Sequence, residues 1–252
     1  MSPDDHGGAL AAFFAQMKPY LLGQQALAPT LRALGPPHGS EDDFSFYRVL
    51  AERNLFKVML ELYGPLRTLW LRRQDELPAA VGTWRAMVDE YIAAHPPAGR
   101  HPNCFGEALP EFLAARRERI PEQPVVYEEL ADFCWIRTRA HQAPDDEGDG
   151  FDSRLFVRQY SYPIPDFVAA LGRDSQAPVP EPQPRVLLVY RHWQQLQVRL
   201  FHPSAAGLVA LARRQGVEVP APLQAVPSDH VEIADAALVE HGVLGPRVTA
   251  PA

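Results

Sequence analysis

The stretch RVLLVYRHWQQLQVRLF, residues 185–201, contains two β-rich runs, Arg185-Val-Leu-Leu-Val-Tyr190 and Leu196-Gln-Val-Arg-Leu-Phe201. A short polar segment separates them, which predicts a β-hairpin. Before residue 142 few segments resemble strands, because the apolar residues there recur at helical spacing. The sequence therefore predicts an α+β fold that is predominantly α.

Toward the N terminus the chain predicts a series of helices. The longest runs from about Asp43 to Tyr63 and is interrupted by Gly64-Pro65, a strong break signal. An amphipathic first helix and a second helix that stops at Gly35-Pro36-Pro37 precede it. The other helices expected in this half cover residues 10–21, 24–34, 65–72, 80–94, 109–117 and 126–141.

Around the hairpin the composition changes. An acidic, glycine-containing loop over residues 145–152 comes first, and a proline-rich connector over 178–184 leads into the hairpin. Ser204 predicts the N-cap of a helix that Gly216 closes, and Asp229 the N-cap of a last helix. The remaining elements expected here are a strand over residues 155–160 and helices over 163–171, 205–215 and 229–241.

These patterns predict four regions. They are an N-terminal helical extension (1–43), a helical domain (44–142), a C-terminal α+β module (150–245) and a tail (246–252). The order strand, strand, helix, helix in the C-terminal module is similar to winged-helix and peptide-recognition modules.

Bulk composition bounds the function. The formal net charge of -7 argues against a protein that coats nucleic acid or anionic membrane. No stretch approaches the roughly 18 apolar residues of a membrane span. The start shows no export signal, so the cytoplasm is the expected location. Cys104 and Cys134 are expected to be buried thiols, with disulfide pairing left open.

A search for chemistry predicts neither catalytic residues nor metal ligands in this chain. His95, His101 and Cys104 lie within ten residues, but their spacing fits no common zinc pattern. The loop at 145–152 lacks the carboxylate that a calcium loop needs at its twelfth position, where Phe156 stands. No nucleophile elbow or phosphate-binding glycine loop is present.

Carboxylates on one predicted helix, Glu128, Glu129 and Asp132, offer acid/base groups, although a solvated charged face is the more common role for such residues. We expect no catalysis by this chain alone.

Charge is unevenly distributed. From Arg185 to Val217 the chain has five arginines and no carboxylate. Acidic groups elsewhere could balance these charges in three dimensions. Alternatively, they form a docking surface for an acidic partner, a peptide or nucleic acid. A short hairpin also leaves an unpaired edge that can accept an extended peptide as an added strand.

Several motifs follow one another in an order that resembles a known family. Phe46-Tyr-Arg-Val-Leu-Ala-Glu-Arg-Asn-Leu-Phe56 contains a Tyr-Arg…Asn-Leu pattern, and Tyr91-Ile-Ala-Ala-His95-Pro-Pro97 ends a helix in a His-Pro turn. Together with the segments below, the order resembles bacterial partner proteins of the HvfC/MbnC type, whose members carry the label DNA-binding domain. The resemblance covers about residues 44–216. Its further segments are Phe105–Leu113, Leu130–Trp135, Ser161–Ile164, Val186–Arg191 and Ala205–Leu211.

The resemblance implies a non-catalytic subunit that forms a heterodimer with a barrel-shaped multinuclear iron oxidase. Such oxidases modify cysteines in ribosomally made precursor peptides, as in methanobactin-type pathways. The iron would be carried by the oxidase, so this chain is expected to hold no cofactor. The partner subunit would help to bind the leader of the precursor peptide. The N-terminal extension and the proline-rich tail depart from the family pattern and leave the pathway and the substrate open.

A DNA-binding transcriptional regulator of winged-helix type is the alternative. Nucleic acid is not the expected partner, because the chain is acidic and the helix over 205–215 carries its arginines, Arg213 and Arg214, at its C-terminal end. Recognition helices usually present their N-terminal half to DNA.

Three residues on the long helix are candidates for contact with the oxidase. Tyr47 and Asn54 are seven positions apart and therefore share a helix face. A buried tyrosine hydroxyl with a polar neighbour is the alternative role for Tyr47. Arg48 would pair with an acidic partner surface or with a group of its own chain.

Three further residues, Tyr190, Arg191 and Arg199, are the candidates for contact with a peptide, because they lie on the predicted hairpin. Trp84 and Trp135 are expected in the core.

Overall fold

The computed structural model describes residues 4–35, 40–98, 102–143 and 154–245. The chain is mostly helical with one three-stranded antiparallel sheet, which confirms the predicted α+β, predominantly α class. It divides into two compact units, Met1–Pro124 and Val125–Ala252. The helix Val125–Gln142, which the sequence places with the helical domain, belongs to the second unit.

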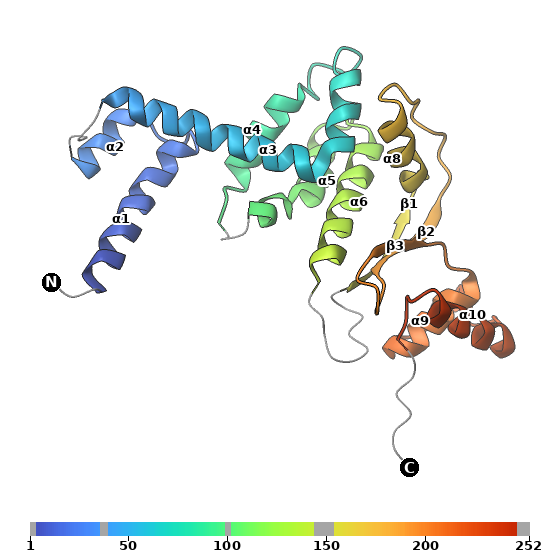
Figure 1. Cartoon of the computed structure of the whole chain (residues 1–252). Coiled ribbons are helices and arrows are strands. Elements are labelled where there is room, and N and C mark those ends of the chain that lie inside the picture. Colours follow the sequence, from blue (N-terminus) through green and yellow to red (C-terminus); the bar gives the residue numbers. More distant parts are fainter. Residues whose placement is uncertain (1–3, 36–39, 99–101, 144–153, 246–252) are drawn as a thin grey trace. The chain divides into compact units, whose positions relative to one another are not determined.

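The first unit consists of helices (Figure 1). Helix α1 (Asp4–Leu21) contacts the short α2 (Leu27–Leu34) and also the long α3 (Glu41–Arg73). Every segment predicted to be helical in this unit contains a helix, but the helices expected over 43–63 and 65–72 form one kinked helix, and α1 begins six residues earlier than expected. The bounds of the helices are α1 Asp4–Leu21, α2 Leu27–Leu34, α3 Glu41–Arg73, α4 Trp84–Ala94, the 3₁₀ helix η1 Pro102–Gly106 and α5 Leu109–Arg119.

The long helix α3 is kinked where the sequence predicts a break. Ser40 and Asp43 form a capping box at its start, with the Ser40 N–H donating to the Asp43 carboxylate at 3.0 Å. Tyr63 has non-helical dihedral angles (φ -124°, ψ 30°) two residues before Pro65. Proline lacks an N–H and its ring clashes with the preceding turn, so the helix bends there and continues to Arg73.

The core of the first unit is rich in aromatic residues with satisfied polar atoms. The buried Tyr63 donates its hydroxyl to the carbonyl oxygen of Gly106 at 2.6 Å, and Trp70 donates its indole N–H to that of Gly82 at 3.0 Å. A Cβ at Gly106 would lie 2.5 Å from Leu62 Cδ1 and 2.9 Å from Tyr63 Cε2, so a side chain here would have to displace these groups. The Tyr63–Gly106 bond joins α3 to η1, and the Trp70–Gly82 bond joins α3 to the segment before α4.

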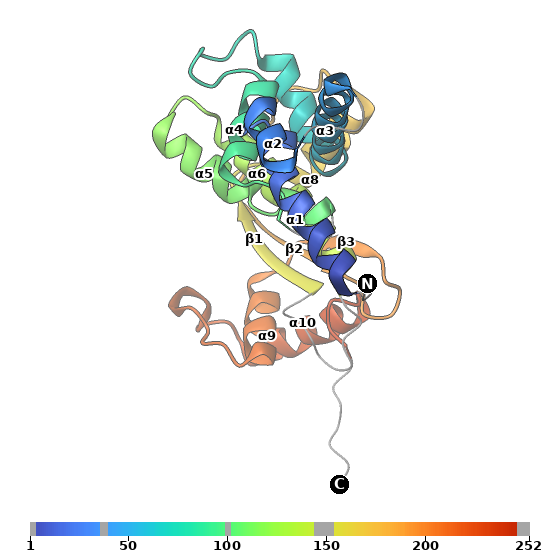
Figure 2. The same ribbon diagram turned by 90° about the vertical axis from the view of Figure 1, so that its left-hand side faces the viewer.

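The second unit is a sheet covered on both faces (Figures 1 and 2). The strand order is β1-β2-β3, and both pairings are antiparallel. Helices α6 and α8 lie on one side of the sheet, and α9 and α10 on the other. The bounds are α6 Val125–Gln142, β1 Leu155–Tyr160, α8 Ile164–Arg173, β2 Arg185–Arg191, β3 Val198–Phe201, α9 Ala205–Gln215, the 3₁₀ helix η2 Ala221–Leu223 and α10 Ser228–Glu240.

Strand alternation divides the side chains between the two faces. Leu155, Leu188 and Tyr190 belong to the core cluster with α9 and α10. On the opposite face, Tyr160 donates its hydroxyl to the carboxylate of Asp132 on α6 at 2.7 Å. The sheet is therefore fixed to α6 by a polar contact and to α9 and α10 by an apolar core.

The predicted helix caps are partly confirmed. Ser204 accepts a hydrogen bond from the Gly207 N–H at 3.1 Å, and Gly216 closes α9 in the left-handed conformation. The expectation for Asp229 was wrong, because α10 begins one residue earlier, at Ser228, and Pro227 is its N-cap. Pro227 has non-helical dihedral angles (φ -57°, ψ 141°), which is usual for the residue at an N-cap.

Candidate functional site

A pocket of about 620 Å³ opens in the first unit between α3, the end of α4 and η1. Asn54, Leu55 and Val58 of α3 line one side of it. Positions three and four residues apart lie near each other on a helix, so Val58 lies beside both Leu55 and Asn54 and α3 presents the three side chains together. The mainly apolar wall with a few polar groups is typical of a binding pocket.

Aromatic stacking positions the histidine of the second wall. The helix α4 ends at Ala94, where Pro96 and Pro97 prevent its continuation. The His95 ring stacks on Tyr91 with centroids 5.2 Å apart. Burial raises the pKa of Tyr91, and its hydroxyl donates to the carbonyl oxygen of Phe105. The imidazole is thereby held at the edge of the pocket.

Polar groups gather at the pocket rim. Asn54, His95, Cys104 and Glu107 are all exposed and line the opening. Of these four residues, Glu107 is the acidic one. Within the described part of the chain, no cation forms an ion pair with its carboxylate. The rim therefore offers acceptors to a ligand, including an unneutralised negative charge.

The two thiols differ. Both cysteines are free, but only Cys134 is buried, so the expectation of two buried thiols was wrong for Cys104. Burial raises the pKa of Cys134 to about 12, although nearby Arg137 opposes this shift. The thiolate is the form that reacts with electrophiles. Cys134 is therefore unreactive for two reasons: it is buried, and its raised pKa keeps the thiol protonated.

We expect iodoacetamide to modify the native chain once, at Cys104, and the unfolded chain twice. Peptide mass spectrometry after a timed reaction at mildly alkaline pH checks this. Modification of Cys134 in the native chain at a rate within tenfold of that of Cys104 would contradict the assignment, since a buried thiol with a raised pKa reacts far more slowly.

The first half of α3 exposes large apolar side chains. Phe46, Tyr47, Val49 and Leu50 are 63, 56, 45 and 41% exposed. Positions 47, 50, 54 and 58 follow helical spacing, so they form one stripe along α3 that leads into the pocket. We call Tyr47, Leu50, Asn54 and Val58 the α3 stripe. Phe13 and Phe14 of α1 are also exposed.

The candidates on α3 thus have different surroundings. Tyr47 is exposed, so the alternative of a buried hydroxyl does not apply to it, and Asn54 lies at the pocket. The Arg48 guanidinium lies 5.6 Å from the ring centroid of Tyr20, which corresponds to the intramolecular alternative. All three α3 candidates, Tyr47, Arg48 and Asn54, are exposed, and Arg48 in addition contacts the Tyr20 ring of its own chain.

The strand candidates are mostly in the interior. Tyr190 is 2% exposed and donates its hydroxyl to the carbonyl oxygen of His241 at 2.9 Å. Arg191 is 8% exposed. Contact with a peptide is therefore not available to these two side chains as they stand. Arg199, on β3, is half-buried and donates to the side chain of Gln195. Trp84 and Trp135 lie in the core as predicted.

The arginine-rich stretch, residues 185–217, is partly neutralised by a carboxylate that lies outside it in the sequence. Arg214 makes two hydrogen bonds to the Asp235 carboxylate, at 2.7 and 2.9 Å. Arg213 and Arg185 are exposed. This arrangement favours the interpretation that distant acidic groups balance part of the charge.

The carboxylates considered for acid/base work have structural partners. Glu129 accepts from the N–H groups of Ser161 and Tyr162, at 2.6 and 3.1 Å. Asp132 accepts from the Arg158 guanidinium at 3.0 Å as well as from Tyr160. Both connect α6 to the end of β1.

The remaining sequence motifs give no site. His101 and the acidic loop at 145–152 lie outside the described residues. Among the residues that are described, no three potential ligands group together as a metal site would require. In the same part of the chain, every helix is too short or too polar to cross a bilayer.

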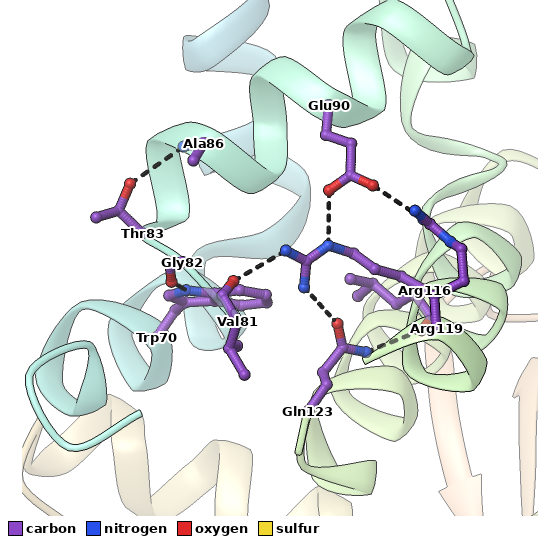
Figure 3. Close-up of polar contacts among 10 residues, drawn as sticks. Trp70, Val81, Gly82, Thr83, Ala86, Glu90, Arg116, Arg119 and Gln123 are labelled. Atoms are coloured by element: carbon purple, nitrogen blue, oxygen red, sulfur yellow. Dashed lines mark hydrogen bonds and ion pairs between the residues drawn. The ribbon is translucent and has the colours of Figure 1, made fainter. Parts of the chain in front are cut away.

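One buried network gave no signal in the sequence (Figure 3). Arg116 on α5 donates from Nε to Glu90 on α4 at 2.8 Å and from its terminal nitrogens to Gln123 and to the carbonyl oxygen of Val81, each at 2.9 Å. Arg119 donates to the other oxygen of Glu90 at 2.9 Å. The network joins α4 to α5 and so supports the helix that carries Tyr91 and His95.

The pocket can therefore accept hydrogen bonds and a positive charge at its rim and apolar groups at its wall. Comparison with protein-family models and with curated proteins gives no match for this chain.

Proposed function

We propose that this chain is a partner subunit that docks another protein through the first half of α3. The observation that carries the proposal is the cluster of exposed apolar residues Phe46, Tyr47, Val49 and Leu50. Isolated apolar residues on a surface need no explanation, but four within five positions of one helix form a patch that a second protein can cover.

The resemblance of residues 46–56 to the HvfC/MbnC-type pattern supports a choice of partner. The same segment carries both the family-like motif and the apolar patch. The proposed partner is a multinuclear iron oxidase that holds the iron, and this chain is its non-catalytic subunit.

The proposed second task is to bind the leader of the precursor peptide along β3. In the described sheet β3 pairs only with β2, so its other edge has backbone groups that an extended peptide can pair with. Leu200 on β3 is exposed, and Arg199 on the same strand offers a positive charge. A leader with acidic and apolar residues fits this edge.

We expect Leu50→Asp and Tyr47→Asp each to lower the amount of co-purified oxidase by about tenfold or more, because a charge at the centre of an apolar interface is desolvated without a partner. The measurement is co-expression with the candidate oxidase, affinity capture, size exclusion and iron analysis of the complex. Ile233→Asp is the matched control, since Ile233 is an exposed apolar residue on α10 of the second unit.

Equal co-purification of all three variants would contradict docking through α3. If the chain elutes alone and instead gives a salt-sensitive shift with duplex DNA, the winged-helix regulator replaces the partner subunit as the explanation.

A further inference from the structure

We infer that the pocket beside α3 receives an arginine side chain presented by the docking partner. The identity of the partner rests on the proposed function, whereas the site itself is argued from the pocket residues alone. The proposal therefore specifies the chemistry of one contact in the docked complex.

The first step concerns the pocket wall. Leu55 and Val58 of α3 and the aromatic pair Tyr91 and Phe105 give it an apolar surface. The volume of about 620 Å³ accommodates a long side chain together with part of its main chain. Such a wall suits the aliphatic stem of arginine, which packs on apolar surface while its charged end stays at the rim.

The second step concerns charge. Glu107 lies at the opening without a cationic partner among the described residues. A phosphate or carboxylate ligand would be repelled there, and a purely apolar side chain would desolvate the carboxylate without compensation. A cationic end group over an apolar stem satisfies both parts of the pocket.

The third step separates arginine from lysine. Besides Glu107, the rim offers the side-chain amide oxygen of Asn54 and the imidazole of His95, which come from different elements. A guanidinium has five donors in a plane and can reach several acceptors at once, and it also stacks on flat rings. The His95 ring, held against Tyr91 at 5.2 Å, is such a ring at the rim.

The fourth step connects the pocket to the docking surface. The α3 stripe runs from Tyr47 to Val58, which is roughly 16 Å along the helix at 1.5 Å per residue. Its far end lines the pocket. A partner segment that covers Tyr47 and Leu50 is thus placed to insert one long side chain at Asn54 and Val58.

The test uses Cys104 as a reporter, because it is exposed and lines the same pocket. The probe is N-acetyl-arginine N-methylamide, and its matched control is the citrulline analogue, which has a neutral urea in place of the guanidinium. We expect the arginine probe to slow the reaction of Cys104 with iodoacetamide at concentrations of about 1 mM or above, and the citrulline probe to need about fivefold more.

Two variants and a control sharpen the result. Glu107→Gln should remove the preference for arginine, and Asn54→Asp should strengthen protection by arginine about fivefold by adding a second negative charge. Glu118→Gln makes the same change on an exposed residue of α5 that does not line the pocket, and should behave like the unmodified chain. Each rate is compared with the rate of the same variant without probe.

Equal protection by the two probes, or an unchanged preference for arginine in Glu107→Gln, would overturn the inference. Because the probes need no partner protein, the pocket can fail this test while the oxidase still co-purifies. In the same way, loss of co-purification would leave a positive probe result intact.

Discussion

Replacing Arg116 by leucine is expected to lower the free energy of unfolding of the first unit by about 3 kcal/mol. The guanidinium is 4% exposed and has acceptors on three sides. Leucine fills part of the volume but leaves the Val81 carbonyl oxygen and the Gln123 side chain without this donor. The value lies at the low end for a broken buried pair, because Glu90 is partly hydrated and keeps Arg119.

Arg119→Leu is the matched control on the same helix. Arg119 contacts the same carboxylate but is 60% exposed, so its removal should cost less than about 1 kcal/mol. Urea denaturation followed by pulsed hydrogen exchange of peptides from α4 and α5 reports on the first unit separately. If the two variants lose a similar free energy of unfolding, the burial of Arg116 does not account for its contribution to stability.

Acid provides a second measure of the same network. Burial alone would raise the pKa of Glu90, but hydrogen bonds from Arg116 and Arg119 outweigh it and lower the pKa below 4.5. Since the folded-state pKa is the lower one, the stabilisation is complete well above pH 4.5 and disappears as the pH falls through the folded-state pKa. Arg116→Leu should therefore lose less stability on acidification than the unmodified chain.

The helices were predictable because their signals are local. The interruption at Gly64-Pro65 follows from the chemistry of proline itself, and the structure places the kink at Tyr63. The hairpin was predictable for the same reason, since residue types and a polar turn define it. The prediction of Asp229 as an N-cap was wrong because an acidic residue stabilises a helix start from the first turn as well as from the cap position, and Asp229 lies in the first turn.

The surroundings of individual side chains were less predictable. Tyr190 ends an uninterrupted apolar run from Val186, which is typical of a strand covered on both faces. That pattern favours burial of Tyr190 over the peptide contact expected for it. The helices that cover Tyr190, α9 and α10, come later in the chain, and no local pattern predicts that they pack on this strand.

The pocket and the arginine network show the same limit. Arg116 and Arg117 look alike in the sequence, and nothing local shows that Glu90 and Gln123 lie beside the buried Arg116. The pocket joins three segments around residues 54–58, 91–98 and 104–108. No spacing rule connects segments so far apart, so their meeting had to be observed.

The second large effect is expected from Gly242→Ala, which should destabilise the second unit by about 3 kcal/mol or more. Gly242 follows α10 with a φ of +69°, where a side chain is already strained. A Cβ there would also lie 2.1 Å from His192 Nε2 and 2.2 Å from its Cδ2. A methyl group cannot fit unless the ring or the backbone moves.

The imidazole cannot move without losing contacts. His192 is buried, and its Nδ1 accepts from the N–H groups of Gln194 and Gln195 at 3.1 and 3.2 Å. Burial, with Arg199 and Arg154 nearby, lowers the pKa of His192, which favours the neutral ring that these two hydrogen bonds to Nδ1 require. The added methyl therefore acts on the turn that joins β2 to β3.

Gly216→Ala separates the steric effect from backbone strain. Gly216 has a φ of +66°, almost that of Gly242, but nothing lies within 4 Å of its added Cβ. We expect it to lose about 1 kcal/mol from the left-handed conformation alone. Hydrogen exchange of β2 and β3 during urea denaturation measures both variants.

A double-mutant cycle then identifies the clash. In a His192→Ala background the ring is gone, so the additional loss from Gly242→Ala should fall to that of Gly216→Ala, although His192→Ala itself lowers stability. If Gly242→Ala destabilises by the same amount with and without the ring, contact with His192 is not the cause, and the strain must lie in the backbone after α10. If the loss falls as expected, the imidazole of His192 is the group that requires glycine at this position.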